Sequence, residues 1–387
     1  MKENWTYKKF GEAFNLLMGK TPSRDNVNYW GGENIWVSIA DLKGKYIEET
    51  KEHITDTAVT ESGISKIPQG TAIMSFKLTI GKAAITKCDL FTNEAIMSFV
   101  PKEENTIDAD YLYYYLKSCK WAGANKAVMG QTLNKKTIAE NIFAYPPLSE
   151  QHRIVSELDL LQSIIDKQQA QLKELDTLAQ AVFYDMFGDP VENEKGWEVK
   201  RLGEVCVSIT DGDHMPPPKV DEGIPFLTIS DIDKDTRKLN FENTFHVPLE
   251  YYNSLKNDRK AQVGDLLYTV TGSYGIPVIV DSDRCFCFQR HIALLRPNKN
   301  TLDIRFLCYW VLCKSVKAMA DNVATGIAQK TVGLGSIRKF VIILPPLTLQ
   351  QEFAEKIEKI ERQKAAISQS IAETQKLFDY TMDKYFN

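Results

Sequence analysis

The feature that most limits the fold of this chain is an internal repeat, in which segments recur roughly two hundred positions later. Six segments recur in the same order, which indicates that a whole structural module was duplicated. Each copy is long enough to bury a core of its own. The matched segments are Trp5–Glu12 with Trp197–Glu204, Ile35–Asp41 with Pro225–Asp231, Gly70–Ser75 with Gly264–Thr269, Tyr111–Leu116 with Phe306–Val311, Pro146–Leu148 with Pro345–Leu347, and Met186–Gly188 with Tyr385–Asn387.

A long helix is predicted directly after the Pro-Pro-Leu sequence of each copy, over residues 149–188 and 348–387. Ser149 and Thr348 occupy the positions where N-caps are expected, because the preceding prolines cannot continue a helix. Gly188, with a proline soon after it, is typical of a helix C-terminus. The rise of an α-helix gives each of these helices a length of roughly 58 Å.

Apolar residues recur in both helices at alternating steps of four and three, which is the heptad pattern of a coiled coil. Two matched apolar seams in one chain can cover each other, so we expect the helices to pair with each other in antiparallel orientation. Pairing with a helix of another protein is the alternative. The predicted seam consists of Ile154, Leu158, Leu161, Ile165, Leu172, Leu175 and Val182 in the first helix, and Phe353, Ile357, Ile360, Ile367, Ile371 and Phe378 in the second.

Short β-rich runs separated by turn residues fill the rest of each copy, with one amphipathic helix in each. These helices are predicted over 109–118 and 304–313. The expected fold class is therefore α+β. Two similar globular domains, 1–148 and 189–347, would be joined by the two long antiparallel helices in a pseudo-two-fold arrangement.

Charge and cysteine content narrow the class of protein. The net charge of −4 arises mainly in 149–188, where three basic residues face seven acidic ones, so a DNA-binding face must be a local pattern of basic side chains. No leader-like or membrane-spanning apolar stretch is present, and the seven cysteines show no zinc or disulfide spacing. We expect a cytoplasmic protein without membrane contact, in which Cys285 and Cys287 are buried apolar residues.

The enzyme classes nearest to this pattern lack their motifs. A DNA amino-methyltransferase needs a polar residue before its Pro-Pro pair and an aromatic ring after it, but Tyr145 and Leu344 precede the pairs here and leucines follow them. Neither a phosphate-binding P-loop nor a glycine-rich cofactor loop is present. The Asp-x-Lys fragments that start at Asp41 and Asp258 are short enough to arise by chance. A self-contained methyltransferase or nuclease is therefore the weaker alternative, and a pure scaffold would leave both modules without a role.

Several segments resemble one known family. Gly19–Gly32 followed by Ile35–Leu42 is similar to the target recognition domains of type I restriction-modification specificity subunits, and Thr210–Pro218 followed by Gly223–Ile232 resembles a variant of that domain. Phe183–Pro190 and Ile343–Leu347 are similar to the helical regions of that family. One departure is the loop at 130–136, which differs in length from its counterpart at 325–331.

The resemblance implies a division of labour. Each recognition domain would read one half of a bipartite site in double-stranded DNA, while the helices would set the spacer and dock two methyltransferase subunits. Restriction subunits would join through the complex. This chain would then be non-catalytic and hold no cofactor or metal, with S-adenosylmethionine, ATP and Mg²⁺ bound by partner subunits only.

Base and phosphate contacts are expected from loops rich in Lys, Arg, Gln, His and hydroxyl side chains. An ordinary solvated role is the alternative for each of them. His214, between Asp213 and a proline-rich turn, is expected to stabilise that turn rather than act in catalysis, and the tyrosines at 111 and 113–115 are expected in the core. The candidates are Lys20, Thr21, Ser23, Arg24, Lys77, Lys82, Gln131, Lys135 and Lys136 in the first module, and His214, Lys219, Ser273, Tyr274, Arg290, His291, Gln329 and Lys330 in the second.

Overall fold

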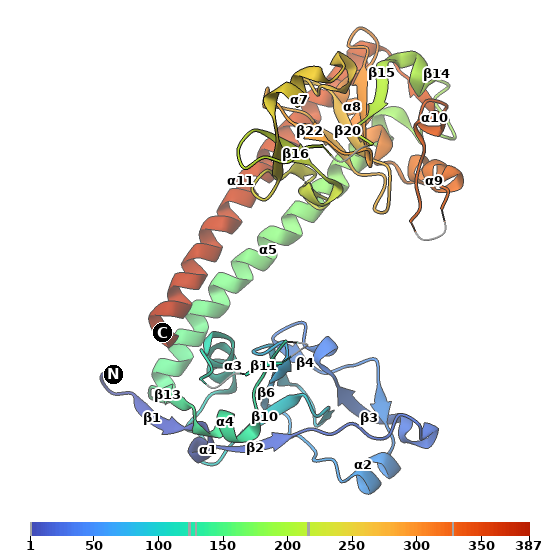
Figure 1. The fold of residues 1–387 in the computed structure, drawn as a ribbon. Coiled ribbons are helices and arrows are strands. Elements are labelled where there is room, and N and C mark those ends of the chain that lie inside the picture. The colour runs from blue at the N-terminus through green and yellow to red at the C-terminus, as the bar shows by residue number, and fades with distance from the viewer. Residues whose placement is uncertain (1, 123–124, 128–129, 215–216, 327–328) are drawn as a thin grey trace. The chain divides into compact units, whose positions relative to one another are not determined.

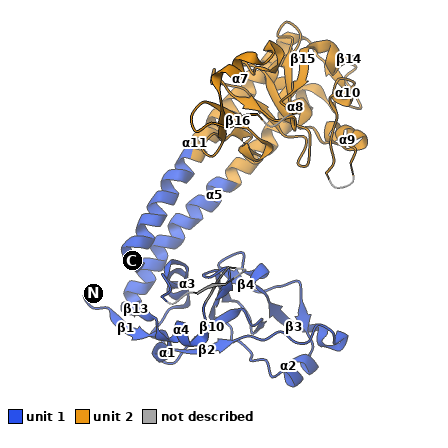
Figure 2. Ribbon diagram, in the orientation of Figure 1, with its two compact units in different colours: residues 1–169, 369–387 blue, residues 170–368 orange. Residues whose placement is uncertain are grey.

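The computed structural model describes residues 2–122, 125–127, 130–214, 217–326 and 329–387 and divides into two compact units (Figures 1 and 2). Unit 1 comprises residues 1–169 and 369–387, and unit 2 comprises 170–368. Each unit contains one globular module, a portion of the first long helix and a portion of the second. The α+β class with two long helices is confirmed.

The module of unit 1 is centred on a sheet with the strand order β2-β10-β6-β8-β4, in which neighbours are antiparallel except at the β4–β8 edge. Both faces of this sheet are covered. Met74 of β6 faces the core formed with α3, whereas Ile73 faces a second cluster that contains Val37 and Leu90. This burial explains why β6 and β8 are apolar or small throughout rather than alternating with charged residues.

The helices and strands of unit 1 before the first long helix have the following bounds. The helices are α1 (Phe10–Ala13), α2 (Asp56–Ser62), α3 (Ala109–Ser118) and α4 (Lys135–Glu140). The strands are β1 (Thr6–Lys9), β2 (Phe14–Met18), β3 (Trp30–Val37), β4 (Tyr46–Ile47), β5 (His53–Ile54), β6 (Ala72–Ser75), β7 (Lys77–Leu78), β8 (Ala83–Thr86), β9 (Phe91–Thr92), β10 (Ile96–Pro101), β11 (Asn125–Ala127), β12 (Gly130–Thr132) and β13 (Ile142–Tyr145).

Unit 2 repeats this plan. Its main sheet has the order β15-β23-β20-β21, β14 pairs with β24 as β1 pairs with β13, and β19-β16-β22 repeats the small sheet β5-β3-β9. The helices are α6 (Leu202–Val205), α7 (Leu249–Ser254), α8 (Ile304–Val311), α9 (Lys314–Val323) and α10 (Leu334–Ile337). The strands are β14 (Glu198–Arg201), β15 (Cys206–Asp211), β16 (Ile224–Leu227), β17 (Ile232–Asp233), β18 (Lys238–Leu239), β19 (Phe245–Val247), β20 (Leu266–Thr269), β21 (Pro277–Ile279), β22 (Cys287–Phe288), β23 (Ile292–Pro297) and β24 (Val341–Leu344).

The long helices α5 (Leu148–Phe187) and α11 (Leu347–Phe386) begin one residue before the predicted starts. Ser149 and Thr348 therefore lie in the first turn, and the prediction that they are N-caps is wrong. The prolines before the leucines take that place, since the carbonyl oxygens of Pro147 and Pro346 accept the first backbone hydrogen bonds of the helices. At the other end Gly188, with φ of 75°, ends α5 as predicted.

A buried glutamine fixes the start of each long helix to its module. The Gln151 side chain is fully buried, where Nε2 donates to the carbonyl oxygens of Thr106 and Pro146 and Oε1 accepts from the amide of Asp108. Asp108 in turn caps α3. Buried amides that keep their hydrogen bonds specify one geometry, because any other leaves polar groups unpaired.

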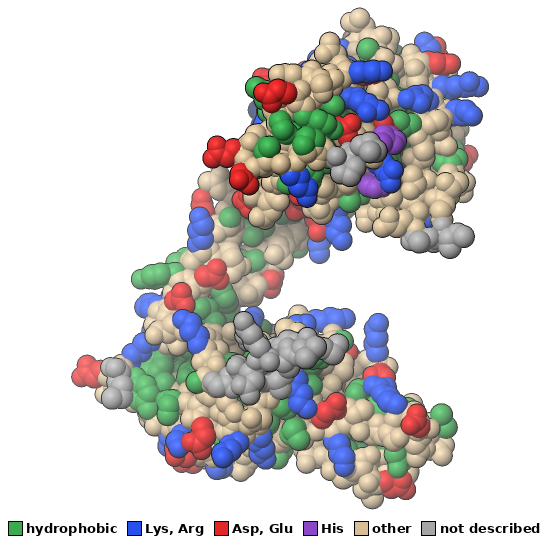
Figure 3. Space-filling model, in the orientation of Figure 1, with side chains coloured by type: hydrophobic (Ala, Val, Ile, Leu, Met, Phe, Trp, Pro, Cys, Tyr) green, Lys and Arg blue, Asp and Glu red, His purple; other side chains and the backbone are tan. Residues whose placement is uncertain are grey.

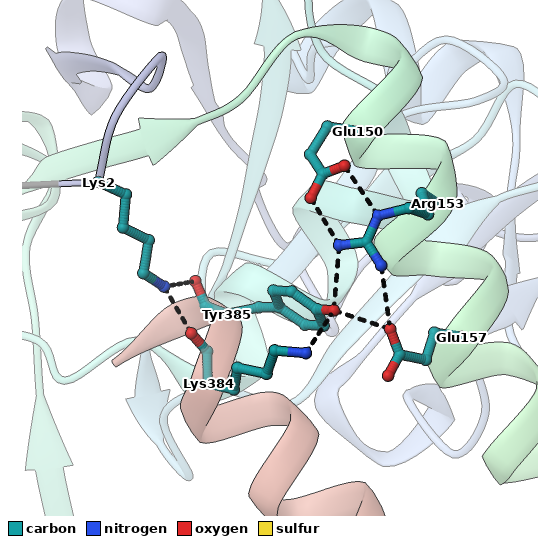
Figure 4. A network of polar contacts seen from close by, with 6 residues as sticks. All are labelled: Lys2, Glu150, Arg153, Glu157, Lys384 and Tyr385. Atoms are coloured by element: carbon teal, nitrogen blue, oxygen red, sulfur yellow. Dashed lines mark hydrogen bonds and ion pairs between the residues drawn. The ribbon is translucent and has the colours of Figure 1, made fainter.

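In unit 1, the first part of α5 packs antiparallel to the last part of α11. Gln168 donates to the hydroxyl of Ser370 at 2.7 Å, and the Tyr385 hydroxyl donates to Glu157 at 2.8 Å, so rising numbers on one helix meet falling numbers on the other. Figure 4 shows Tyr385 between Arg153 and Glu157. The Lys2 ammonium donates to the last carbonyl oxygens of α11, which places a positive charge at a helix C-terminus.

In unit 2, the last part of α5 packs antiparallel to the first part of α11. Lys364 pairs with Asp176 at 2.8 Å, and the rings of Phe187 and Phe353 lie 5.4 Å apart. The predicted seam residues that are buried are Ile154, Leu158, Leu161, Ile165, Phe353, Ile357, Ile360 and Phe378, and those that are half-buried are Leu172, Leu175, Val182, Ile367 and Ile371.

Other predictions about the core can be compared with the burial of single residues. The tyrosines at 111 and 113–115 are buried, as expected. Cys287 is buried too, but the prediction that Cys285 is buried is wrong, because β22 begins only at Cys287 and leaves Cys285 exposed. Within the described residues, no helix combines the length and apolar character that a membrane crossing requires.

Candidate nucleic-acid interface

Three segments of the first module meet around the carboxylate of Glu94. They are the loop after β2, the β6–β8 loop, and the β9–β10 turn that carries Glu94 itself. The Thr21 hydroxyl donates to Glu94 Oε2, and the charges of Lys77 and Arg24 act on the same carboxylate. The structure thus brings three of the candidate residues together.

The ionisation of Glu94 follows from these neighbours. Partial burial would raise the pKa of the Glu94 carboxyl, but the hydrogen bonds from Thr21 and from the backbone lower it. The charges of Lys77 and Arg24 lower it further, so the pKa of Glu94 lies below its ordinary value. The Glu94 carboxylate is therefore an ionised acceptor close to the Thr21 hydroxyl and to the charges of Lys77 and Arg24.

Arg24 holds the loop after β2 in place. Its guanidinium lies 3.8 Å from the centroid of the Trp30 ring and donates to Glu52, with an Nη2 to Oε2 distance of 3.0 Å. The hydrogen bond from Arg24 lowers the pKa of the Glu52 carboxyl. Trp30 Nε1 donates to the backbone carbonyl oxygen of Ser23, and Ser23 itself is exposed. The Arg24 guanidinium is thus already used within the protein, in a stacked and doubly bonded geometry.

Close packing of backbone fixes the root of this loop in both modules. The amide of Lys20 donates to the carbonyl oxygen of Thr92 at 2.8 Å, as the amide of Asp213 donates to that of Phe288 at 3.0 Å. A Cβ atom at Gly19 or at its counterpart Gly212 would overlap those carbonyl oxygens. Glycine is therefore required where each loop leaves its strand. The Lys20 ammonium donates to the carbonyl oxygen of Ser62 at 2.5 Å.

The loop between β6 and β8 in the first module and the equivalent loop between β20 and β21 in the second are each closed by a hydroxyl side chain. Ser75 Oγ accepts from the amide of Lys82 at 3.1 Å, and Thr269 Oγ1 accepts from the amide of Ile276 at 3.0 Å. Lys82 is exposed and Lys77 half-buried at the two ends of the first loop. The backbone of the loop is therefore the same in both modules, whereas its outward side chains differ.

Leu78 has an unusual backbone conformation at the tip of the first of these loops. Its φ is 65°, the amide of Thr79 donates to the carbonyl oxygen of Lys77 across it at 2.8 Å, and its side chain is 56% exposed. Gly272, with φ of 69°, occupies the equivalent place in the second module. A leucine in the left-handed region is strained, and a glycine is not.

In the second module, three candidate residues line one cavity of about 600 Å³, namely Ser273, His291 and Gln329. The His291 Nδ1 atom lies 3.0 Å from the Thr271 hydroxyl. Burial lowers the pKa of His291, and the nearby charges of Arg290 and His214 lower it further, which favours the neutral ring near pH 7. Figure 3 shows histidine and basic side chains gathered on one face of unit 2.

His214 belongs to a network of hydrogen bonds and ion pairs at the loop after β15. Its Nε2 atom lies 2.8 Å from Asp211 Oδ2, and Arg259 lies within ion-pair distance of Asp211 at 3.5 Å and of Asp213 at 3.6 Å. Tyr251 donates to Asp213. The aspartates are therefore used within the protein, which fits the expected role in stabilising the turn, and no group of three metal-binding side chains occurs in the described part of the chain.

The remaining candidates lie apart from these clusters or have other neighbours. The Tyr274 hydroxyl donates to Asp321 at 2.6 Å, and Lys219 lies over the Phe245 ring. Lys136 lines a separate hollow with Tyr115 and Phe386. Lys135 is exposed at the start of α4, and Lys330 is exposed while its backbone carbonyl oxygen accepts from the amide of Gly272. Gln131 belongs to β12, but its side chain lies outside the described residues, as do residues 327–328.

Comparison with known proteins agrees with this organisation. The model of the type I restriction modification DNA specificity domain matches residues 2–177 and again 194–375, so each match contains one module and most of the helix that follows it. The chain is 29% identical over 257 residues to the MjaIX specificity subunit of a type I restriction enzyme from Methanocaldococcus jannaschii, a match covering 60% of this chain and 59% of that relative. The match thus spans less than two thirds of that protein.

Longer matches have lower identity. The EcoKI specificity subunit of Escherichia coli is 22% identical over 93% of this chain and 82% of its own length. A solved structure from work on complex assembly and conformational transition of the type I R-M system matches all of this chain with a TM-score of 0.62 and 18% identity. The type I S subunit of M. genitalium matches with a TM-score of 0.54 and 14% identity. These two structures share the fold of this chain.

Proposed function

This chain belongs to the type I restriction modification DNA specificity family, and from that premise we propose that it selects the DNA sequence on which a multisubunit restriction-modification complex acts. Each module reads one half of a bipartite site in double-stranded DNA. The observation that carries this proposal is the pair of family matches, each of which coincides with one module and its own cluster of polar loops.

Catalysis belongs to partner subunits in this proposal. The chain selects the site, while methyltransferase subunits, two per chain, bind S-adenosylmethionine and methylate adenine. Restriction subunits supply ATP- and Mg²⁺-dependent cleavage. The support from this chain is chemical, because the leucines after both Pro-Pro pairs and the residues before them cannot hold and stack a target base as an amino-methyltransferase must.

The long helices join the two modules that read the half-sites. In this proposal α5 and α11 set the spacer between the half-sites and provide the docking surface for the methyltransferase subunits. The two-fold repeat of module and helix supports two equivalent docking positions.

Mapping of adenine methylation in the source genome, with and without this gene, tests the proposal. We expect one bipartite motif to disappear with the gene and to return with a plasmid copy. A methylome that is identical in both strains while the partner methyltransferase is expressed contradicts the proposal. Co-purification of the chain with that methyltransferase checks that the complex has formed.

A further inference from the structure

The turns that lead into the inner strands β10 and β23 of the two main sheets are equivalent in backbone but opposite in charge. In the first module the amide of Asn93 donates to the carbonyl oxygen of Val37 at 2.9 Å, and in the second the amide of Gln289 donates to that of Leu227 at 3.0 Å. The amide that starts the next strand closes each turn, at Ile96 and at Ile292. The middle of the turn is Glu94 in one module and Arg290 in the other.

Both side chains are exposed at the candidate interface of their own unit. Glu94 is ionised, as shown above, and the Thr21 hydroxyl occupies only one of the several acceptor positions of its carboxylate. The backbone amide of Arg290 donates to the backbone carbonyl oxygen of Asp213 at 3.0 Å, but within the residues that the structure describes its guanidinium has no hydrogen bond or ion pair. This differs from Arg24, whose guanidinium is fully engaged.

The chemistry of base edges distinguishes the two charges. In the major groove a carboxylate can accept from the N4 amino group of cytosine, whereas the N7 and O6 acceptors of guanine repel it. A guanidinium has the converse preference and donates to both guanine acceptors at once. A carboxylate on a DNA-facing surface is repelled by phosphates, so base reading gives it a role that phosphate binding cannot.

We propose that these two turns are the equivalent base-reading elements of the modules, with Glu94 accepting from cytosine N4 in one half-site and Arg290 donating to guanine in the other. This rests on the proposed function. Each half-site then contains a C·G pair at the equivalent position, read from the cytosine strand by the first module and from the guanine strand by the second.

Substitution of Glu94 by glutamine separates base reading from a role in holding the loop. The amide oxygen of glutamine still accepts from Thr21, so the loop after β2 stays anchored. Glutamine pairs with adenine rather than cytosine. In the complex with its methyltransferase, we expect Glu94→Gln to lower the preference for cytosine at one position of the first half-site by about tenfold to a hundredfold and to leave the second half-site unchanged.

The measurement is competition binding of labelled duplexes that carry each base at each half-site position. Glu104→Gln is the matched control, because Glu104 follows β10 whereas Glu94 precedes it, and this exposed residue should have no effect. Arg290→Lys keeps the charge but loses the two-point contact, so it should weaken the preference for guanine at one position of the second half-site only. It serves as the second variant if Glu94→Gln impairs folding, which circular dichroism would reveal.

The outcomes separate this inference from the proposed function. If the complex of the unsubstituted chain with its methyltransferase shows no preference for a bipartite DNA sequence, the proposed function fails. If the unchanged complex has such a preference but Glu94→Gln and Arg290→Lys leave both half-sites as they were, the inference is overturned while the proposed function stands. A change spread over both half-sites with either variant, or half-sites without C·G pairs, also overturns it.

Discussion

The two modules share one framework and differ in the side chains that this framework presents. Gln151 and Gln350 each make the same three hydrogen bonds, to the loop before the cap, to the proline carbonyl, and from the amide of the capping aspartate. In the candidate interface loops, by contrast, Glu94 of the first module corresponds to Arg290 of the second, and Leu78 corresponds to Gly272. Positions that are buried and bonded were kept through duplication, whereas exposed loop positions diverged, as expected if the loops carry recognition.

Each module is also attached to a long helix by an ion pair, and the residues that form this pair differ between the two units. In unit 1 the Lys45 ammonium pairs with Asp159 of α5 at 2.6 Å. In unit 2 Arg237 pairs with Asp176 of the same helix at 3.1 Å. The acidic character of 149–188 is therefore used to hold a basic loop residue of each module, with different partners in the two units.

The largest expected effect compares Phe187 with Phe386, which occupy the same position in the duplicated helices. Phe187 is fully buried against Phe306 and Phe353, whereas Phe386 is half-buried beside Tyr111. Phe187→Ala should cost about 4 kcal/mol of unfolding free energy in its unit, and Phe386→Ala about half of that. Urea unfolding followed by hydrogen exchange in each unit measures both, and equal losses would contradict the difference in packing.

A second experiment tests whether the framework is the same in both copies. Gln151→Leu removes three buried hydrogen bonds and leaves the Asp108 amide unpaired, so it should cost about 3 kcal/mol. Gln350→Leu should cost the same within about 0.5 kcal/mol, because its contacts are the same. Denaturant midpoints of the two variants decide this. A difference above about 1.5 kcal/mol would show that the two frameworks are not energetically equivalent.

A third experiment concerns the strained loop tip. Leu78→Gly should raise the stability of unit 1 by about 1 kcal/mol, since it relieves a left-handed leucine. The reciprocal change Gly272→Leu should lower the stability of unit 2 by about the same amount. Thermal unfolding of both variants checks whether the first change raises stability and the second lowers it. Destabilisation by Leu78→Gly would mean that the leucine side chain contributes more than the strain costs.

The smallest effect is a pH dependence in unit 1. The pKa of Glu52 is lowered by its hydrogen bond from Arg24, so the stabilisation is present above the ordinary glutamate pKa of 4.5 and is lost as pH falls through the lowered value. In melting temperatures from pH 7 down to pH 3, Glu52→Gln should show a shallower acid decline than the unchanged chain. Glu104→Gln is the control. Parallel curves for Glu52→Gln and the unchanged chain would count against this ion pair.

The sequence predicted the repeat, the two helices and their antiparallel pairing, because periodicity and proline positions are local signals. It did not predict that Phe183 and Phe187 would be buried in the last turns of α5. A heptad pattern assumes one partner helix, but this end of α5 packs against both α11 and the aromatic core around Phe306, so the buried face is wider than a coiled-coil seam.

The candidate site was predictable at the level of loops but not of single side chains. Arg24 is basic and lies in a recognition loop, yet its partner Glu52 is distant in sequence and pairs with it only in the folded module. Glu94 could not be predicted from the sequence, because base and phosphate contacts are expected first from basic, amide and hydroxyl side chains. Its alignment with Arg290 at equivalent backbone positions is visible only once the two turns are compared in three dimensions.

Replacement of one module tests whether each module recognises its own half of the DNA site. Residues 1–145 would be exchanged for the corresponding module of another specificity subunit, the chain expressed with its own methyltransferase, and the methylated motif mapped across a genome. We expect one half-site to change while the other half-site and the spacer stay the same. A motif in which both half-sites change, or in which neither does, would contradict the reading of two modules that each recognise one half of the site.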